Sequence, residues 1–357
     1  MKIIHTGDVH LGAPFDNLPK EKSRIRRVEL LDSFIRLCAY ARENDVSAVL
    51  IAGDLFDENQ TPSYVKKQVF QAVEGAKPVQ FFYVLGNHDD EFSESGLPSN
   101  LLLFSWTHTW CTYSLGEGVV ISGLDTKNLS AQTLSSLALS PSQFNVVLLH
   151  GDIYGKGREA IDLRLLENKN VDYLALGHIH KPDLERRRLD ARGSYRYCGC
   201  LEGRGFDEIG KRGFFLLEIE KGVIVSEKVL SFSNREVREV RVDISACQSY
   251  FDVENTVMNA LSNVGVQDVV KLTLIGSVAP SLKKDKELLT ARLSQRLFFV
   301  KIVDESRIKW NPADYANDTS ERGEFVKEVG RYAMNERQRD EILEIGLKAI
   351  AGEEIDL

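Results

Sequence analysis

The chain has 357 residues, of which 43% are hydrophobic and 27% are charged, an ordinary globular composition with room for two domains. No apolar run approaches the roughly 18 residues of a membrane-spanning helix, and the first residues lack the apolar region of a secretory signal. The five scattered cysteines are typical of a reducing compartment. We therefore expect a cytoplasmic protein with no membrane partner. A net charge of -8 excludes nucleic-acid binding driven by the whole surface, but not binding through local basic clusters.

Short apolar strands that end in polar, glycine-containing turns recur along residues 1–235. The predicted strands cover residues 2–6, 48–52, 79–85, 119–124, 145–150 and 173–177. Several are apolar throughout, which indicates strands that are covered on both faces. Residues 27–44 place apolar side chains at spacings of three and four, which predicts an amphipathic helix between the first two strands. The pattern predicts an α/β fold with a layered core.

The pattern changes to antiparallel β from about residue 195, where three further strands are joined by glycine-containing turns. A second unit of the type β-α-β-α-β follows, with strands at 235–244, 269–276 and 297–304 and helices at 248–263 and 284–296. It carries no catalytic motif. Residues 321–352 have the apolar spacing of one or two amphipathic helices. We therefore expect domains at 1–235 and 236–320 and a helical segment at 321–357.

Polar side chains follow five of the predicted strands at the point where each strand ends. In layered α/β folds, ligands gather at the carboxyl ends of strands, so we expect these side chains to converge at one rim. Glycines beside them permit tight turns and close backbone approach. The seven side chains expected to converge are Asp8, His10, Asp54, Asn87, His150, His178 and His180, and the same motifs also carry Asp57, His88 and Asp89.

The chemistry of this set indicates a pair of metal ions. Imidazole nitrogens and carboxylate oxygens together suit borderline divalent metals such as Mn, Fe, Zn and Co. The absence of cysteine from the set argues against a structural zinc site. Seven ligands are too many for one four-coordinate ion, but they suit two ions that share a bridging carboxylate. Two-metal sites, with ions about 3.5–4 Å apart, perform in-line displacement at phosphorus.

The ordered motifs "GDVH", "GDLFD", "GNHD" and "GHIH", with a lone histidine before the last, resemble the calcineurin-like metallophosphoesterase superfamily over residues 1–235. The resemblance implies a four-layer αββα sandwich with two divalent ions. It implies that the first ion is held by Asp8, His10 and His180, that Asp54 bridges, and that the second ion is held by Asn87, His150 and His178. His88 would donate a proton or stabilise the transition state, oriented by the Asp57 carboxylate.

Alternatives remain for several polar residues. Asp57 could instead cap the turn or helix that follows it. His5, inside the first strand, and His108, in "WTHTW", are expected to be structural. Cys198 and Cys200 are expected to pack in the core, because two cysteines with no partner pair are a weak zinc motif.

Three segments resemble the SbcD-type DNA repair exonucleases: "HTGDVHLGAPF", "AGDLFDENQTPS" and "YCGCLEGRGFDEIGKRGFFLLEI". The form "GRGFDE" is most similar to the YhaO-type branch, although Cys200 stands where serine is usual. The module at 236–305 takes the place of that family's capping domain, which helps to position DNA. The resemblance implies a Mn-dependent DNA exonuclease or endonuclease, a coiled-coil SMC-like ATPase as partner subunit, and a homodimer.

A nuclease also needs cations that contact phosphates. Basic clusters lie at residues 20–27 and 186–196, and Arg204 is expected near the rim as a substrate-binding residue. Two other functions stay open. One is a phosphodiesterase or phosphatase for a small nucleotide, against which the second unit argues. The other is a DNA-tethering subunit without catalysis, against which the complete ligand set and His88 argue.

Overall fold

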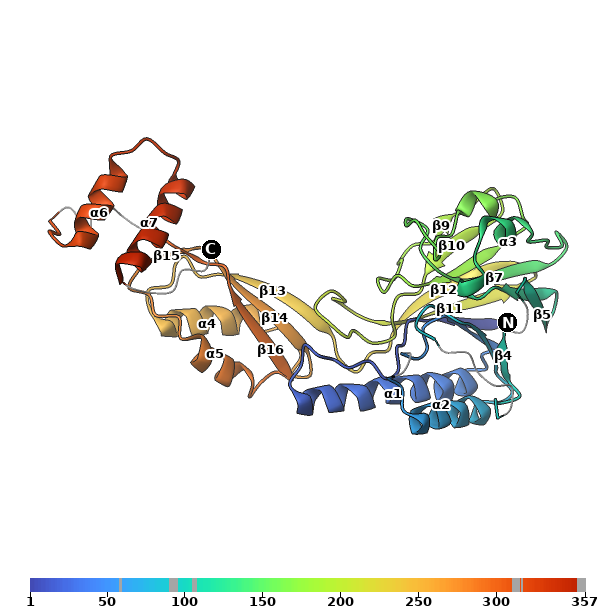
Figure 1. The fold of residues 1–357 in the computed structure, drawn as a ribbon. Helices are drawn as coiled ribbons and strands as arrows, with labels where there is room; N and C mark the ends of the chain where they lie inside the picture. Colours follow the sequence, from blue (N-terminus) through green and yellow to red (C-terminus); the bar gives the residue numbers. More distant parts are fainter. Residues whose placement is uncertain (58–59, 90–95, 105–107, 310–314, 316, 352–357) are drawn as a thin grey trace. The chain divides into compact units, whose positions relative to one another are not determined.

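Figure 1 shows the computed structural model of the chain, which describes residues 1–351 apart from 58–59, 90–95, 105–107, 310–314 and 316. The chain divides into two compact units, Met1–Val237 and Arg238–Leu357. Each unit has its own hydrophobic core. No described helix is both long and apolar enough to span a bilayer.

The first unit is built on two six-stranded sheets. Most neighbouring strands of the first sheet are parallel, but β11 pairs antiparallel with both β1 and β12. Because β1, β2 and β3 run in the same direction, their carboxyl ends lie at one edge. In spatial order the strands are β12 (Val223–Ser231), β11 (Gly213–Glu220), β1 (Lys2–Thr6), β2 (Ala48–Ala52), β3 (Gln80–Val84) and β4 (Leu101–Leu103).

The second sheet is also mainly parallel. In spatial order its strands are β5 (Cys111–Gly116), β6 (Val119–Gly123), β7 (Phe144–His150), β8 (Tyr173–Gly177), β10 (Ser194–Tyr197) and β9 (Arg187–Arg188). The antiparallel prediction is wrong for β10, which pairs in parallel with β8. The chain first turns back through β9, which is antiparallel to β10, and so returns beside β8 in the same direction.

Strand β2 shows how the layers form. Successive side chains of a strand point to opposite faces. Val49 and Ile51 pack with helices α1 (Lys20–Glu43) and α2 (Ser63–Gly75), which cover the outer face of the first sheet (Figure 1), whereas Leu50 packs between the sheets. Burying one such side chain fully contributes about 1.5–3 kcal/mol, so both faces of the strand stabilise the fold.

Short helices cover the outer face of the second sheet. These are η1 (Thr126–Asn128), α3 (Ala131–Ser135) and η2 (Leu163–Leu165). Leu134 of α3 shares a buried cluster with Leu149 of β7 and Leu176 of β8. The order helix, sheet, sheet, helix confirms the four-layer αββα sandwich.

Helix α1 begins seven residues before the predicted start at 27, directly after Pro19. Its first turns are held by Arg26, which is 1% exposed and pairs with Glu202 at 2.8 Å and Glu29 at 2.6 Å. Because Glu202 is 176 residues away, the local spacing of apolar residues does not predict this contact. The same pairing gives Arg26, one arginine of the basic cluster at residues 20–27, a structural role.

The second unit has the predicted order of strands and helices. Its main sheet has the order β13 (Val237–Asp243), β14 (Val269–Ile275) and β16 (Phe299–Asp304), with helices α4 (Tyr250–Ala260) and α5 (Lys286–Leu293). A second, two-stranded sheet pairs β15 (Ser277–Val278) with β17 (Arg307–Ile308). The C-terminal segment forms two helices, α6 (Glu321–Gly330) and α7 (Glu336–Ala351), around Val326 and Leu343.

Candidate metal centre

Loops at the carboxyl ends of β1, β2, β3, β7 and β8 bring polar side chains from both sheets together. The loops are tied by backbone hydrogen bonds, in which Asp8 N donates to Gly53 O at 3.0 Å and His10 N donates to Asp54 O at 2.9 Å. Asp8, His10, Asp54 and His178 all have φ between 49° and 101°. Side chains other than glycine rarely adopt this left-handed backbone, and such strain concentrates at functional sites.

Two glycines permit the close approach of the two sheets at this edge. A Cβ atom at Gly177 would collide with the carbonyl of Ala52, and one at Gly53, where φ is 82°, would collide with the His150 ring. The glycines therefore let backbone and imidazole pack where a side chain would separate them.

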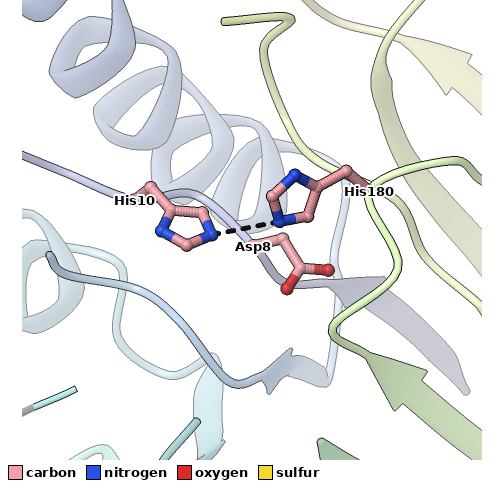
Figure 2. Close-up of side chains that lie close together, drawn as sticks. All are labelled: Asp8, His10 and His180. Carbon is pink, nitrogen blue, oxygen red and sulfur yellow. Dashed lines mark hydrogen bonds between the residues drawn. The ribbon is translucent and has the colours of Figure 1, made fainter. Parts of the chain in front are cut away.

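Asp8, His10 and His180 form the first cluster, in which the possible ligand atoms lie within 4.8 Å of one another. The Nε2 atoms of the two histidines are 3.2 Å apart. Figure 2 shows the two rings facing each other through these nitrogens, with the Asp8 carboxylate beside them. Asp8 is fully buried and His10 is 2% exposed.

The hydrogen bonds around the two rings fit a cation. His10 Nδ1 lies 2.7 Å from Asp57 Oδ1, and His180 Nδ1 lies 2.6 Å from Glu208 Oε1. A carboxylate only accepts hydrogen bonds, so both Nδ1 atoms carry a proton, and each ring in its neutral form presents a lone pair on Nε2. Burial lowers the pKa of His10, which keeps that ring neutral. With both rings neutral, two Nε2 lone pairs 3.2 Å apart repel each other unless a cation binds between or beside them.

Asp8, Asp54 and His150 form the second cluster. His150 Nδ1 donates to the Ala52 carbonyl at 2.9 Å, which leaves Nε2 as an acceptor 2.9 Å from Asn87 Oδ1. Burial lowers the pKa of His150 to about 4, so the ring is neutral. Two acceptors facing each other again suit a shared cation.

One oxygen of Asp54, a member of the second cluster, also lies near a histidine of the first cluster. Asp54 Oδ2 is 3.5 Å from His10 Nε2 and 3.4 Å from His150 Nε2. The other oxygen, Oδ1, accepts a hydrogen bond from the backbone N–H of His88 at 2.9 Å. This is the position expected of a bridging carboxylate.

The two buried carboxylates differ in charge environment. Burial raises the pKa of Asp8 well above its usual range, and the neighbouring Asp54 carboxylate raises it further. Burial also acts to raise the pKa of Asp54, but the charge that His150 and His10 would carry when protonated and the hydrogen bond from the His88 N–H act against it, so that pKa is lowered. Charges buried this close together are costly without a positive partner. Oxygen and imidazole donors together fit divalent ions such as Mn²⁺ or Zn²⁺.

His178 lies at the side of these clusters. Its ring centroid is 5.1 Å from that of His150, and its Nε2 is 3.7 Å from Glu159 Oε2. Its side chain is 25% exposed, while its backbone N–H donates to Asp8 Oδ1 at 2.9 Å. The structure thus places His178 next to the second cluster and does not bring it within that group.

Asp57 is closer to His10 than to His88, its predicted partner. The Asp57 Oδ1 atom is 2.7 Å from His10 Nδ1 and 4.0 Å from His88 Nδ1, and the second distance is too long for a hydrogen bond. His88 has a 53% exposed side chain, and its ring lies 5.1 Å from that of His10. His88 therefore stands at the solvent side of the first cluster.

Arg204 lies next to the first cluster, held by a residue that the sequence analysis missed. Its backbone N–H donates to Glu208 Oε2 at 2.6 Å, and its guanidinium is 3.1 Å from Glu208 Oε1. Glu208 is 3% exposed. Burial acts to raise its pKa, but the hydrogen bond from His180 and the charge of Arg204 outweigh it, so the pKa is lowered. The available signal was the segment "GRGFDE", in which only Arg204 was singled out.

The remaining polar residues have structural partners. The carboxylate of Asp89 accepts from the backbone N–H groups of Phe56 and Gly86, both at 2.9 Å, and so joins the loops after β2 and β3. His5 is buried and lies 2.8 Å from the hydroxyl of Tyr173.

A hollow of about 600 Å³ adjoins Asn87. Its walls include Leu85, Asp125, Lys127, Arg158 and Glu159. Pockets for small ligands occupy about 300–1,000 Å³, so the hollow is of that size. The lining carries two exposed cations, Lys127 and Arg158, and three carboxylates, those of Asp89, Asp125 and Glu159.

Comparison with known proteins places the chain in a family. The calcineurin-like phosphoesterase family matches residues 1–182. The uncharacterized metallophosphoesterase YhaO of Bacillus subtilis is 28% identical over 251 residues, which cover 64% of this chain and 59% of YhaO. The DNA double-strand break repair protein Mre11 of Haloferax volcanii is 27% identical over 274 residues, which cover 72% of this chain and 60% of that protein.

The match to each of these two relatives spans about three fifths of the relative's own length. Among solved structures, a dimetal phosphatase from Danio rerio is 14% identical with a TM-score of 0.43, covering 61% of this chain and 92% of that chain. The curated relatives agree with the SbcD- and YhaO-type branch predicted from the motifs. The chain belongs to the calcineurin-like phosphoesterase family of hydrolases, which use divalent metal ions.

Proposed function

We propose that this protein is a metal-dependent nuclease that hydrolyses phosphodiester bonds of DNA. The observation that carries the proposal is the pair of clusters that meet at Asp54, in which buried carboxylates and histidines lie within reach of one another. DNA as substrate is supported by the likeness to the repair protein Mre11 and by the SbcD-type segments.

The ligand roles follow from the resemblance, and the two clusters support those of Asp8, His10, His180, Asp54 and His150. Asp8, His10 and His180 would hold one ion, Asn87, His150 and His178 would hold the other, and Asp54 would contact both. When bound, two divalent ions would supply positive charge to the phosphate and acidify a water molecule. We infer Mn²⁺ as the metal, because imidazole and carboxylate ligands suit it and the resemblance implies it.

The protein's own groups would act around that core. His88 is exposed on the side of the first cluster, where it would donate a proton to the leaving oxygen. Its 4.0 Å separation from Asp57 would shorten when substrate binds, since catalytic hydrogen bonds are often long without substrate. Arg204, beside His180, would contact a DNA phosphate.

The wider setting is inferred from the resemblance. We place the protein in the cytoplasm, where its five free cysteines would stay reduced. It would act in DNA repair as a homodimer, with the second unit as a capping domain and an SMC-like coiled-coil ATPase as partner. Helix α7 is a candidate surface for that partner, since Ile342 and Ile345 are 43% and 40% exposed.

Cleavage of end-labelled DNA tests the proposal. Purified protein would be incubated with single- and double-stranded DNA labelled at the 3′ or 5′ end, with Mn²⁺, Mg²⁺ or EDTA. We expect Mn²⁺-dependent cleavage that is lost in Asp54→Asn and His88→Gln and retained in His108→Gln, whose histidine lies 3.4 Å from Asn128 and outside the clusters. Hydrolysis of small nucleotide esters without DNA cleavage would contradict the DNA part, and DNA binding without any hydrolysis would favour a tethering role.

A further inference from the structure

Both histidines of the first cluster are held in the same way. His10 Nδ1 meets Asp57 Oδ1 at 2.7 Å, and His180 Nδ1 meets Glu208 Oε1 at 2.6 Å. Each Nδ1–H is engaged by a carboxylate, so each Nε2 lone pair is directed at the space beside Asp8. A carboxylate that accepts the second N–H of a metal-binding histidine fixes its tautomer and its ring orientation.

The contacts of His180 decide which neighbour sets its tautomer. Arg204 Nη2 lies 3.0 Å from His180 Nδ1 and 3.1 Å from Glu208 Oε1. A guanidinium only donates, so Arg204 could bond to Nδ1 only if that nitrogen lacked a proton. The shorter distance of 2.6 Å to a carboxylate requires the proton, and Arg204 then donates to Glu208. Glu208 is therefore the group that controls the ring.

Glu208 is itself rigidly held. Its second oxygen accepts from the backbone N–H of Arg204 at 2.6 Å, and Cys200 Sγ lies 3.6 Å away. The loop that carries His180 is fixed to the same segment, since Arg212 Nη1 donates to His180 O at 2.6 Å. A buried charge is retained at low cost only where several donors satisfy it, and this carboxylate has them.

We propose that Glu208 is a positioning residue for the first metal ion, acting through His180 as Asp57 acts through His10. The inference rests on the proposed metal centre, but not on DNA as the substrate. Glu208 lies outside residues 1–182, which the family matches, so the role comes from the segment that follows the shared motifs. Loss of the carboxylate would free the ring to rotate or to carry its proton on Nε2, where it blocks metal binding.

Calorimetric titration of the metal-free, full-length protein with Mn²⁺ tests this role. The variants are Glu208→Gln and Glu208→Ala. The matched control is Glu202→Gln, because Glu202 is also buried, lies six residues earlier and pairs with Arg26, yet contacts no histidine in the described structure. Circular dichroism and thermal unfolding without metal report whether each variant folds.

We expect Mn²⁺ affinity at one of two sites to fall about 10- to 100-fold in Glu208→Gln and further in Glu208→Ala, with the other site unchanged. Glu202→Gln should keep both affinities even where it lowers the melting temperature. Wild-type affinity at both sites in a folded Glu208→Gln would overturn the proposal. So would an equal loss of affinity in Glu202→Gln, since that would make the effect one of general stability.

A spectroscopic measurement keeps the proposal testable if Glu208→Ala does not fold. Proteins labelled with ¹⁵N-histidine and free of metal would report the protonated ring nitrogen of His180. We expect the Nδ1–H form in the wild type and an increased Nε2–H population in Glu208→Gln. A wild-type ring protonated on Nε2 would contradict it. Neither measurement involves DNA. Absence of DNA cleavage would therefore contradict the proposed nuclease function but would not affect the proposed role of Glu208.

Discussion

The two halves of the centre differ in what anchors their histidines. In the first cluster, His10 and His180 each contact a carboxylate through Nδ1, at 2.7 and 2.6 Å. In the second, His150 contacts a neutral backbone carbonyl, Ala52 O, at 2.9 Å, and His178 is 25% exposed beside Glu159. A charged acceptor makes an imidazole a stronger ligand than a neutral one does. On the proposed metal centre, we therefore predict a tightly held first ion and a more readily exchanged second ion.

The largest expected effect is that of Asp54→Asn, which acts on both halves at once. The asparagine keeps an acceptor for the His88 N–H but removes the charge that lies near both His10 and His150. Metal binding in both clusters should weaken, and activity should fall by roughly 1,000-fold or more, equivalent to at least about 4 kcal/mol of transition-state stabilisation. Steady-state rates and Mn²⁺ titration check this. Loss at one site only would contradict the bridging position.

Replacing the exposed His88 should separate catalysis from metal binding. His88→Gln should lower kcat by about 10²–10⁴-fold, because proton transfer by a positioned side chain contributes that much. Mn²⁺ affinity should stay at the wild-type value, since the ring lies on the solvent side of the cluster. Rates and titrations for His88→Gln and His108→Gln check this. A loss of Mn²⁺ binding in His88→Gln would instead show that His88 is a metal ligand.

Paired ligand substitutions sharpen the comparison between the halves. His10→Gln should lower the affinity for the first ion by more than the roughly 10- to 100-fold expected from loss of an outer hydrogen-bond partner. His178→Gln should lower the affinity for the second ion by only about tenfold, because the ring of His178 is half-buried and lies outside the second cluster. Titration of both variants with Mn²⁺ provides the test. Equal effects would show that the anchoring carboxylates do not distinguish the halves.

A smaller effect concerns a histidine that lies away from the clusters. Burial, with the charge of Arg196, lowers the pKa of His5 to about 3, from 6.5 in the unfolded chain. The unfolded state therefore binds more protons as pH falls below 6.5, so His5 contributes stability above pH 6.5 that is lost towards pH 3. The slope is at most about 1.4 kcal/mol per pH unit.

Urea unfolding at pH 7, 6 and 5 in the presence of EDTA measures this slope. His5→Phe, which replaces one ring by another beside Phe215, should make the unfolding free energy less dependent on pH. The variant also leaves the hydroxyl of Tyr173 without its partner at 2.8 Å, so a general loss of stability is expected at all three pH values. An unchanged slope would mean that His5 protonates freely in the folded protein.

The sequence predicts the parts of the centre that depend on strand direction. β1, β2 and β3 are parallel, so Asp8, Asp54 and Asn87 follow strands that end at the same edge. The burial of both faces of strands such as β2 follows equally from their uninterrupted apolar composition. These features need only the type of each strand and the residues after it.

Features that depend on distant partners were not predictable in the same way. Glu208 lies 28 residues from His180, and Asp57 lies 47 residues from His10. The pairing of β10 beside β8 depends on the return through β9. Each of these contacts forms only when the sheets pack together and bring distant residues or strands side by side. The local spacing of residues in the sequence therefore does not predict them.

The most direct test of the centre is anomalous diffraction from crystals of the full chain grown with Mn²⁺. We predict two anomalous peaks per chain, one contacted by Asp8, His10 and His180 and the other by Asn87, His150 and His178. The Asp54 carboxylate should lie between them. A single peak, or two peaks that share no carboxylate, would contradict the two-ion centre.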